Sequence, residues 1–297
     1  MNDRRYPGRE ARLAKGWLAA NRFLILRRAS QLFFLALFLA GPWFGLWIVE
    51  GTLAGSLTLG VLPLTDPFIV LQSLVAGHLP AVSALTGALI VLVAYALIGG
   101  RVYCSWVCPV NPVADAAHWL HRRLDLPKGW QPKRSTRLWL VAGVLAVSGL
   151  TGTIAWEIVN PVTMLHRGII FSMGAVWGIV AAIFVFDLVV ARHGWCGHLC
   201  PVGAFYGLVG AKSLIRVSAV HREACDDCMD CYAVCPESHV ISPALKGKTG
   251  SSTVILAPDC TNCGRCIDVC SQDVFAFTHR FDSKPSHRTD PAGQNAA

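Results

Sequence analysis

Charge is scarce in this chain, and basic residues are missing altogether from several long stretches. Only 15% of the 297 residues are charged, whereas 54% are hydrophobic, which is too apolar for an ordinary soluble domain. Four stretches lack Lys and Arg and approach the ~20 residues that span a bilayer, namely 31–49, 81–100, 138–156 and 173–191. The sequence therefore predicts four transmembrane helices.

The basic residues that are present alternate along the chain. None lies in 50–80 and only Arg167 lies in 157–172, whereas eight lie in 1–30 and seven in 101–137. Because Lys and Arg collect on the cytoplasmic side of a membrane protein, this alternation predicts that both termini are cytoplasmic. The net charge of +8 then reflects the membrane topology, and some of the basic residues could also contact anionic lipid. We expect no nucleic-acid partner.

No cysteine is left outside a motif, so nothing in the sequence indicates an exported disulfide scaffold. Eight of the 12 cysteines form two runs with the spacing Cys-x2-Cys-x2-Cys-x3-Cys, at 225–235 and 260–270. This is the spacing of bacterial ferredoxins that bind [4Fe–4S] clusters. The alternatives are zinc, which favours separated cysteine pairs, and disulfides, which favour short secreted chains. The runs therefore predict two [4Fe–4S] clusters.

With this spacing, the fourth cysteine of each run binds the cluster of the other run. Three thiolates on a tight loop hold three irons of one cluster, and the fourth thiolate, which follows after three intervening residues, reaches the other cluster. The first cluster is therefore expected on Cys225, Cys228, Cys231 and Cys270. The second cluster is expected on Cys260, Cys263, Cys266 and Cys235.

The other four cysteines form two Cys-x3-Cys-Pro motifs that lie 92 residues apart, Cys104 with Cys108 and Cys196 with Cys200. The predicted spans that precede the motifs begin with the same separation, which indicates a parallel internal duplication. The second cysteine of each motif precedes a proline that can begin a helix, and a thiol at a helix N-terminus has a lowered pKa. We expect the four thiols to converge in a redox or metal site. The alternative is that they are packed structural cysteines.

The first outer loop, 50–80, is long and apolar, and Asp66 and His78 are its candidate quinol-binding residues. A site that oxidises quinol needs a proton acceptor and a hydrogen-bond partner beside an apolar cleft. The alternative is turn chemistry, because Asp66 is followed directly by Pro67. Asp187 is a further acidic residue, inside the fourth predicted span. It either has a functional role or simply reaches the membrane interface from the inner end of that span.

These patterns predict an all-α membrane bundle of four transmembrane helices with a C-terminal α+β bacterial two-cluster ferredoxin-like domain. The expected order is a basic interfacial N-terminus at 1–30, the transmembrane domain at 31–216, the ferredoxin-like domain at 217–281 and a disordered tail at 282–297.

The combination of four spans, two Cys-x3-Cys-Pro motifs and a two-cluster ferredoxin domain resembles the NapH family. The matching pieces are VLPLTDPFIVLQ at 61–72, YCSWVCPVNP at 103–112, WCGHLCPVGAFYGL at 195–208 and the two ferredoxin runs. The resemblance implies a multi-pass protein of the bacterial inner membrane that oxidises membrane quinol as the quinol dehydrogenase component of a periplasmic nitrate reductase system. It also implies a periplasmic iron–sulfur partner resembling NapG, with a multihaem cytochrome as a further candidate.

Similar architecture occurs in MauN-type proteins of methylamine utilisation, in NosR-type proteins and in FixG/CcoG-type proteins of oxidase assembly. Two other functions therefore stay open at this point. One is a cytoplasm-facing metal reductase or maturation factor of the FixG/CcoG type, and the other is a structural anchor for a soluble partner. Quinol-dependent reduction of the clusters would distinguish the first function from both.

Overall fold

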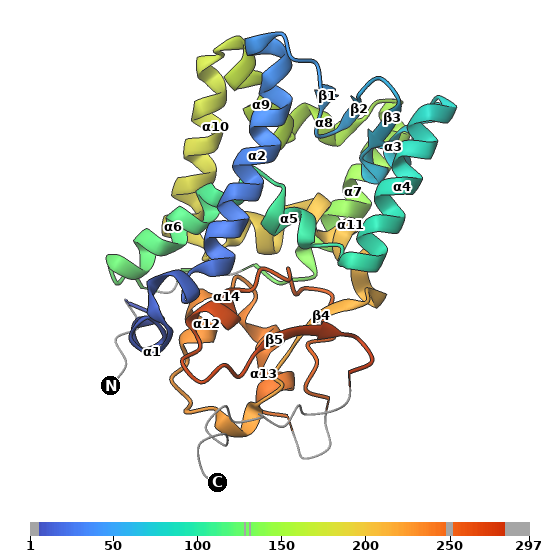
Figure 1. The fold of residues 1–297 in the computed structure, drawn as a ribbon. Coiled ribbons are helices and arrows are strands. Elements are labelled where there is room, and N and C mark those ends of the chain that lie inside the picture. Colours follow the sequence, from blue (N-terminus) through green and yellow to red (C-terminus); the bar gives the residue numbers. More distant parts are fainter. Residues whose placement is uncertain (1–5, 128, 131, 248–251, 283–297) are drawn as a thin grey trace.

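The computed structural model describes residues 6–127, 129–130, 132–247 and 252–282. The chain forms a helical body, residues 22–209, and beneath it a ferredoxin unit, residues 215–282 (Figure 1). Helix α1 (Arg9–Ala19) precedes the body and packs on α14 (Arg265–Val269) of the ferredoxin unit. The predicted disordered tail, 282–297, lies outside the described residues except for Asp282.

The helical body begins with α2 (Arg22–Phe44) and a three-stranded sheet of β1 (Val49–Thr52), β2 (Gly55–Thr58) and β3 (Leu62–Thr65). Nine helices follow in the described part of the body: α3 (Pro67–Val75), α4 (Val82–Ile98), α5 (Val102–Trp106), α6 (Asn111–Arg123), α7 (Thr136–Thr151), α8 (Ala155–Val159), α9 (Pro161–Phe171), α10 (Gly174–Val185) and α11 (Pro201–Val209). Two π-helical turns, Phe186–Val190 and Trp195–Leu199, lie between α10 and α11.

The prediction of an all-α bundle of four transmembrane helices is wrong. Within the described residues, only α2 is long and apolar enough to cross a membrane, and it runs from Arg22 to Phe44 rather than over 31–49. The runs 81–100 and 138–156 form helices of 17 and 16 residues, and the run 173–191 is divided between α10 and a π-helical turn. At about 1.5 Å per residue, these helices are shorter than a hydrocarbon core of about 30 Å.

Backbone conformation sets the helix lengths, whereas the prediction relied on the absence of Lys and Arg. Gly45 and Gly152 adopt left-handed conformations, with φ of 71° and 66°, and end α2 and α7. Glycine reaches positive φ without the steric penalty of a Cβ atom, so it commonly stops a helix. The apolar residues after Gly45 leave the helix and enter β1, which is why the first predicted span ends early.

The sheet is the second departure from the all-α prediction, and it determines where Asp66 lies. The strands are antiparallel in the order β1-β2-β3, with Gly55 of β2 opposite Thr65 of β3. Strand β3 packs closely on α4, because a Cβ atom at Gly87 would lie 2.9 Å from the Pro63 carbonyl oxygen. The chain passes from β3 into α3, where the Asp66 carboxylate caps the helix by accepting from the Phe68 amide at 2.9 Å.

The ferredoxin unit is a small α+β fold around one apolar core. Strands β4 (Ile215–Ser218) and β5 (Ala276–His279) pair antiparallel, and α12 (Asp230–Val234), α13 (Ile241–Leu245) and α14 lie between them in the chain. Short 3-10 turns occur at Gly210–Lys212, Arg222–Ala224 and Ser238–Val240. Val217, Ile241 and Val274 form the centre of the core and are each 1% exposed.

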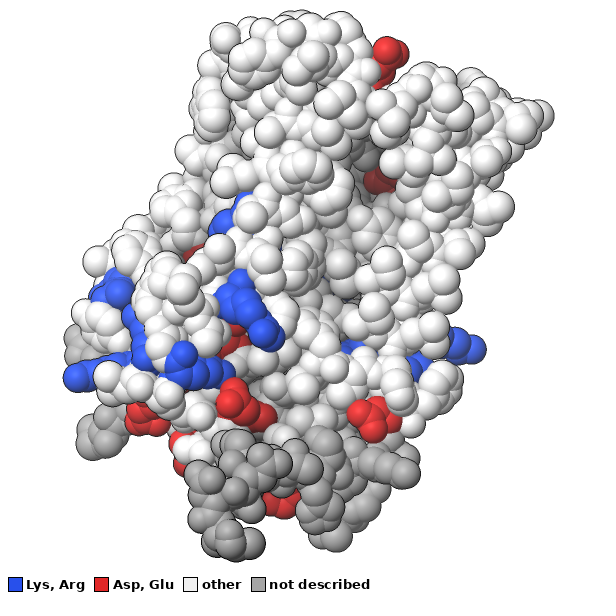
Figure 2. All heavy atoms as spheres, viewed as in Figure 1, with Lys and Arg blue, Asp and Glu red and all other residues white. Residues whose placement is uncertain are grey.

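The surface divides along the same line as the fold. On the face shown in Figure 2, Lys and Arg gather where the helical body meets the ferredoxin unit, and the body above them is almost uncharged. This body exposes large apolar side chains, among them Leu89, Trp139 and Leu150. An extended apolar surface of this kind indicates contact with lipid or with another protein.

Candidate metal centres

The two ferredoxin runs form loops with the same backbone course. Asp227 and Met229 have left-handed φ of 57° and 65°, and Asn262 and Gly264, the equivalent residues of the second run, have φ of 47° and 71°. These turns curl each loop around its cysteines. Gly264 is also required by packing, because a Cβ atom there would lie 2.4 Å from Cγ of Phe23 at the start of α2.

Each loop lines a cavity that the other run completes. The first cavity is lined by Cys225, Cys228, Cys231 and Cys270. The second cavity is lined by Cys260, Cys263, Cys266 and Cys235. Each donor set therefore contains four thiols, three from one run and one from the other, and this composition fits a [4Fe–4S] cluster.

Burial disfavours the ionised form of two thiols of the first cavity. Burial raises the pKa of Cys228 and of Cys231 to about 12. Because a metal binds the thiolate, assembly of a cluster in these cavities must release protons.

The four cysteines of the Cys-x3-Cys-Pro motifs line a third cavity, in the helical body. We call it the cysteine cavity; its wall also includes Asp66, Tyr103, Trp156, Asn160 and Trp195. The two repeats meet there, because a Cβ atom at Gly203 would lie 3.7 Å from the Cys104 sulfur and 3.9 Å from Cys200 Cβ. The structure thus brings both motifs and Asp66 to one site.

The thiols of this cavity differ from the expectation of lowered pKa values. Burial raises the pKa of Cys200 to about 12 and that of Cys108 further, although backbone amides act in the opposite direction. The start of α11 at Pro201 supplies such amides to Cys200. Desolvation outweighs the effect of the helix N-terminus and disfavours the thiolate form of these cysteines.

Two capping residues of the cavity wall extend the internal duplication. Asp66 precedes Pro67 and caps α3, and Asn160 precedes Pro161 and caps α9 by accepting from the Val162 amide at 3.1 Å. Helices α6 and α11 begin directly after the two cysteine motifs. Four helix N-termini therefore start at this cavity, and their dipoles favour an anionic occupant such as bound thiolates. The repeated Asx-Pro pair was visible in the sequence, but the sequence reasoning missed Asn160.

Tyrosine side chains connect Asp66 to the first cysteine motif. The Tyr206 hydroxyl donates to Asp66 Oδ1 at 3.2 Å, and the Tyr206 ring stacks on that of Tyr103, with centroids 5.1 Å apart. Tyr103 precedes Cys104 and lines the cavity. Asp66 is 9% exposed, so its carboxylate is enclosed beside the thiols.

The other two predicted acid–base candidates lie elsewhere. His78 is exposed, its Nε2 lies 2.9 Å from the Gly152 carbonyl oxygen, and it is not among the residues that line the cysteine cavity. Asp187 is buried, and its Oδ1 accepts from the Trp195 amide at 2.8 Å. Asp187 therefore positions the backbone of the second cysteine motif.

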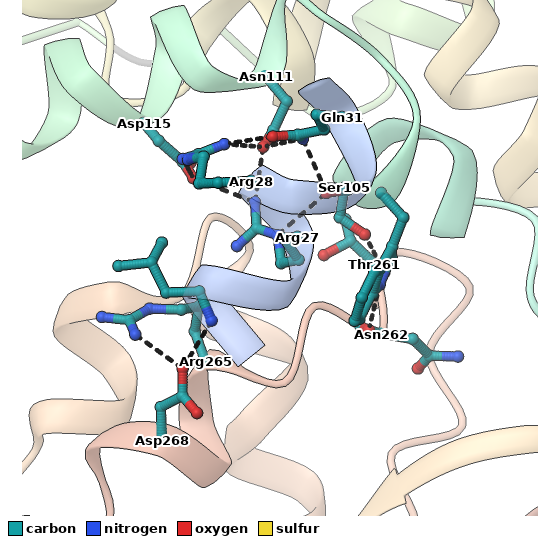
Figure 3. A network of polar contacts seen from close by, with 12 residues as sticks. Arg27, Arg28, Gln31, Ser105, Asn111, Asp115, Thr261, Asn262, Arg265 and Asp268 are labelled. Carbon is teal, nitrogen blue, oxygen red and sulfur yellow. Dashed lines mark hydrogen bonds and ion pairs between the residues drawn. The ribbon is translucent and has the colours of Figure 1, made fainter. Parts of the chain in front are cut away.

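Polar contacts bind the ferredoxin unit to the helical body. The Asp268 carboxylate accepts from the Phe23 and Leu24 amides, both at 3.0 Å, and so caps the first turn of α2. Figure 3 shows the adjoining contacts, in which Ser105 of α5 donates to the Thr261 carbonyl at 2.7 Å. The loop of the second ferredoxin run is thus held against the end of the helical body that faces the ferredoxin unit.

A buried ion network joins the cysteine cavity to the second cluster loop. Arg101 donates to Glu237 Oε1 at 2.8 Å, to the Asp259 carbonyl at 2.8 Å and to the Cys196 carbonyl at 3.1 Å. Arg137 pairs with the same Glu237 and with Asp259. These guanidinium groups compensate the carboxylates that, with His239, could otherwise hold a metal ion. Burial opposes ionisation of Asp259, but the hydrogen bond from His239 and the charge of Arg137 hold its pKa below the usual range.

Replacing Glu237 with alanine should destabilise the junction strongly. The Arg101 and Glu237 side chains are 2% and 3% exposed, so the change leaves two guanidinium groups buried without this carboxylate. The expected loss is about 3–5 kcal/mol, measured by denaturant unfolding of the intact protein. Asp273→Asn, which breaks the exposed Lys15 pair, is the control and should cost less than about 1 kcal/mol. Equal losses would contradict the account of the buried network.

Comparison with known proteins finds iron–sulfur families over much of the chain. A model described as "4Fe-4S binding domain" matches twice, at residues 80–127 and 170–218, which supports the internal duplication. A model described as "4Fe-4S dicluster domain" matches residues 224–284. No solved structure gives a significant match.

Curated relatives match nearly from end to end. The chain is 50% identical over 283 residues to the ferredoxin-type protein NapH of Escherichia coli, which covers 95% of this chain and 98% of that protein. It is 55% identical over 267 residues to the methylamine utilization ferredoxin-type protein MauN of Paracoccus denitrificans, covering 90% of this chain and 94% of that protein. NapH of Haemophilus influenzae is 50% identical over 281 residues, or 95% of this chain and 98% of that protein.

Proposed function

The chain belongs to the ferredoxin-type protein family that includes NapH and MauN, and on this premise we propose that it oxidises membrane quinol and passes the electrons to a partner protein. The family and the two [4Fe–4S] domain matches make it an iron–sulfur electron-transfer protein. The observation that carries the quinol proposal is the cysteine cavity, because it unites a carboxylate, four thiols and apolar walls.

In the proposed reaction, quinol becomes quinone and releases two electrons and two protons. Asp66 accepts one of these protons, the other leaves to the aqueous phase, and the Tyr206 hydroxyl holds the Asp66 carboxylate in position. The apolar side chains Trp156 and Val202 exclude water from the site. When bound, [4Fe–4S] clusters supply one-electron acceptors in the ferredoxin unit.

The four thiols of the cysteine cavity are proposed as the intermediate redox site. They act either as ligands of a soft metal or as pairs that cycle between disulfide and dithiol. Arg101 supports this role because it bonds the Cys196 carbonyl and the Asp259 carbonyl. Asp259 precedes Cys260, a proposed ligand of the second cluster. A continuous bonded route therefore leads from the cavity to that cluster.

We place the protein in the bacterial inner membrane, with both ends of the chain on the cytoplasmic side. The apolar surface of the helical body and the length of α2 support insertion of the body into lipid. Helix α1 and strand β5 both lie at the ferredoxin end (Figure 1), where Lys and Arg gather (Figure 2). Basic residues favour the cytoplasmic side of a membrane.

The family offers two destinations for the electrons. The similarity to NapH supports a periplasmic nitrate reductase system with a NapG-like iron–sulfur partner, and a multihaem cytochrome is a further candidate. The similarity to MauN, at 55% identity, supports a role in methylamine utilisation instead. Growth of a deletion strain on nitrate and on methylamine would distinguish the two.

Replacing Asp66 with asparagine should slow quinol-driven reduction of the clusters by about 100-fold, because the site loses its proton acceptor. Asparagine is an equally good helix cap, so α3 should remain intact. The measurement is anaerobic stopped-flow reduction of the purified protein by a short-chain quinol, with reduction by dithionite as the test of intact clusters. His78→Gln, outside the cavity, is the control and should change the rate little. A normal rate in the Asp66 variant would remove this residue from the mechanism.

A further inference from the structure

A large basic pocket lies where the helical body meets the ferredoxin unit. It lies between α2, α6 and the loops of the two ferredoxin runs. We call it the junction pocket; its charged lining residues are Arg27, Arg28, Arg122, Arg265 and Asp115. It is separate from the proposed quinol site, and it borders the second cluster cavity, with which it shares Pro236 and Arg265.

The carboxylates around the junction pocket do not balance its four arginines. Asp115 is shared by Arg27 at 3.0 Å and Arg28 at 2.5 Å (Figure 3), and Arg265 pairs with Asp268 at 2.8 Å. Two carboxylates therefore face four guanidinium groups. This excess of positive charge favours a bound anion.

Arg122 is the arginine whose charge is least compensated. In the described parts of the chain it forms no ion pair, and its hydrogen bond there is donated from Nη1 to the Ala233 carbonyl at 3.1 Å. Its Nε is buried and has no hydrogen-bond partner there. Burial and the neighbouring Arg192 and Arg265 lower the pKa of Arg122 to about 10. A bound anion would relieve this repulsion and satisfy the donor.

His118 gives independent support for a ligand. It lines the pocket, is 3% exposed and uses Nε2 in a 3.0 Å contact with the Ala233 carbonyl oxygen. Its Nδ1 is buried without a hydrogen-bond partner among the described residues. Because Nε2 must donate to that carbonyl, Nδ1 is an acceptor, so it fits a hydroxyl group of a ligand or a water that the ligand holds.

The position of the pocket indicates what kind of anion it takes. Leu24 and Trp119, which is 51% exposed, add apolar surface to the basic wall. The pocket lies at the level where the uncharged body gives way to Lys and Arg in Figure 2. A ligand with a phosphate and an acyl chain could place the phosphate against the arginines and the chain along the body.

We propose that the junction pocket binds the phosphate group of an anionic phospholipid, with Arg122 as its principal donor. This proposal rests on the proposed membrane location of the helical body. It assigns the pocket a ligand, and it does not depend on the quinol reaction. Val234 and Pro236, which flank Cys235, also line the pocket, so the lipid would lie beside the second cluster loop.

The test is native mass spectrometry of the intact, cluster-loaded protein in a neutral detergent. Dioctanoyl phosphatidylglycerol should bind at least about 10-fold more tightly than dioctanoyl phosphatidylcholine. Arg122→Gln should weaken phosphatidylglycerol binding by about 10-fold, the usual effect of losing a charge-assisted hydrogen bond. Arg123→Gln removes the same charge from the next, exposed position outside the pocket and should bind as the wild type does.

Equal binding of the two lipids, or no effect of Arg122→Gln, would overturn the proposal. Inorganic phosphate that binds alone as tightly as phosphatidylglycerol would show a free-anion site and overturn the lipid assignment. If Arg122→Gln does not fold, Arg28→Gln tests the same pocket with the same expected direction. Iron content and dithionite reduction of each variant report on the clusters separately, so a failed lipid site leaves the proposed electron transfer standing.

Discussion

Replacing Cys235 with alanine should remove the cluster of the other run and spare the cluster of its own. Cys235 lies in the first run of the sequence, yet it lines the cavity formed by Cys260, Cys263 and Cys266. Because each [4Fe–4S] cluster in this arrangement needs its fourth thiolate from the opposite run, iron should fall from about eight to about four atoms per ferredoxin unit.

The identity of the lost cluster can be read by EPR of the reduced protein. Cys263→Ala removes a ligand of the same cavity, and Cys225→Ala removes a ligand of the other cavity. The spectrum of Cys235→Ala should match that of Cys263→Ala. A match with Cys225→Ala would show that each run keeps its own fourth ligand and would contradict the exchange.

Replacing both Cys104 and Cys196 with serine should abolish quinol-driven reduction of the ferredoxin clusters. The two residues come from different repeats but line the same cavity, so the change removes half of its thiols. Serine is a poor ligand for soft metals and cannot form a disulfide, so both versions of the proposed intermediate lose their chemistry. Stopped-flow reduction by quinol is the measurement.

The control for this variant is the chemical reductant. Dithionite should still reduce both ferredoxin clusters, because their eight ligands are untouched. Metal analysis then distinguishes the two versions: a metal site predicts that the wild type contains more bound metal than two [4Fe–4S] clusters require, and thiol pairs predict no excess. Normal quinol turnover in the double variant would leave only a structural role for the motifs.

The ferredoxin unit was the part most open to prediction because its ligands are local in sequence. Each run fixes three thiols within a few residues, and the fourth follows from the spacing. The family matches confirm the iron–sulfur prediction for residues 224–284. The conformations at Asp227 and Asn262 then follow from wrapping a short loop around a cluster.

The helical body was less predictable because apolar composition does not determine where a helix ends. Gly45 and Gly152 stop α2 and α7 inside apolar runs, and a strand begins at Val49, still within the first run. The sheet depends on pairing between β2 and both neighbouring strands, and no local sequence pattern predicts this pairing. The role of Asn160 could be recognised only in the tertiary structure, because the second Asx-Pro pair is seen to matter only once the cavity is known.

The central claim is that electrons enter from quinol at the cysteine cavity and reach the ferredoxin clusters within this one chain. The most direct test is anaerobic mixing of the purified, cluster-loaded protein with a short-chain quinol, followed by the visible absorbance and EPR signals of the clusters. The account predicts that the clusters are reduced and that quinone appears in proportion. Clusters that dithionite reduces but quinol leaves oxidised, at a quinol potential below that of the clusters, would contradict it.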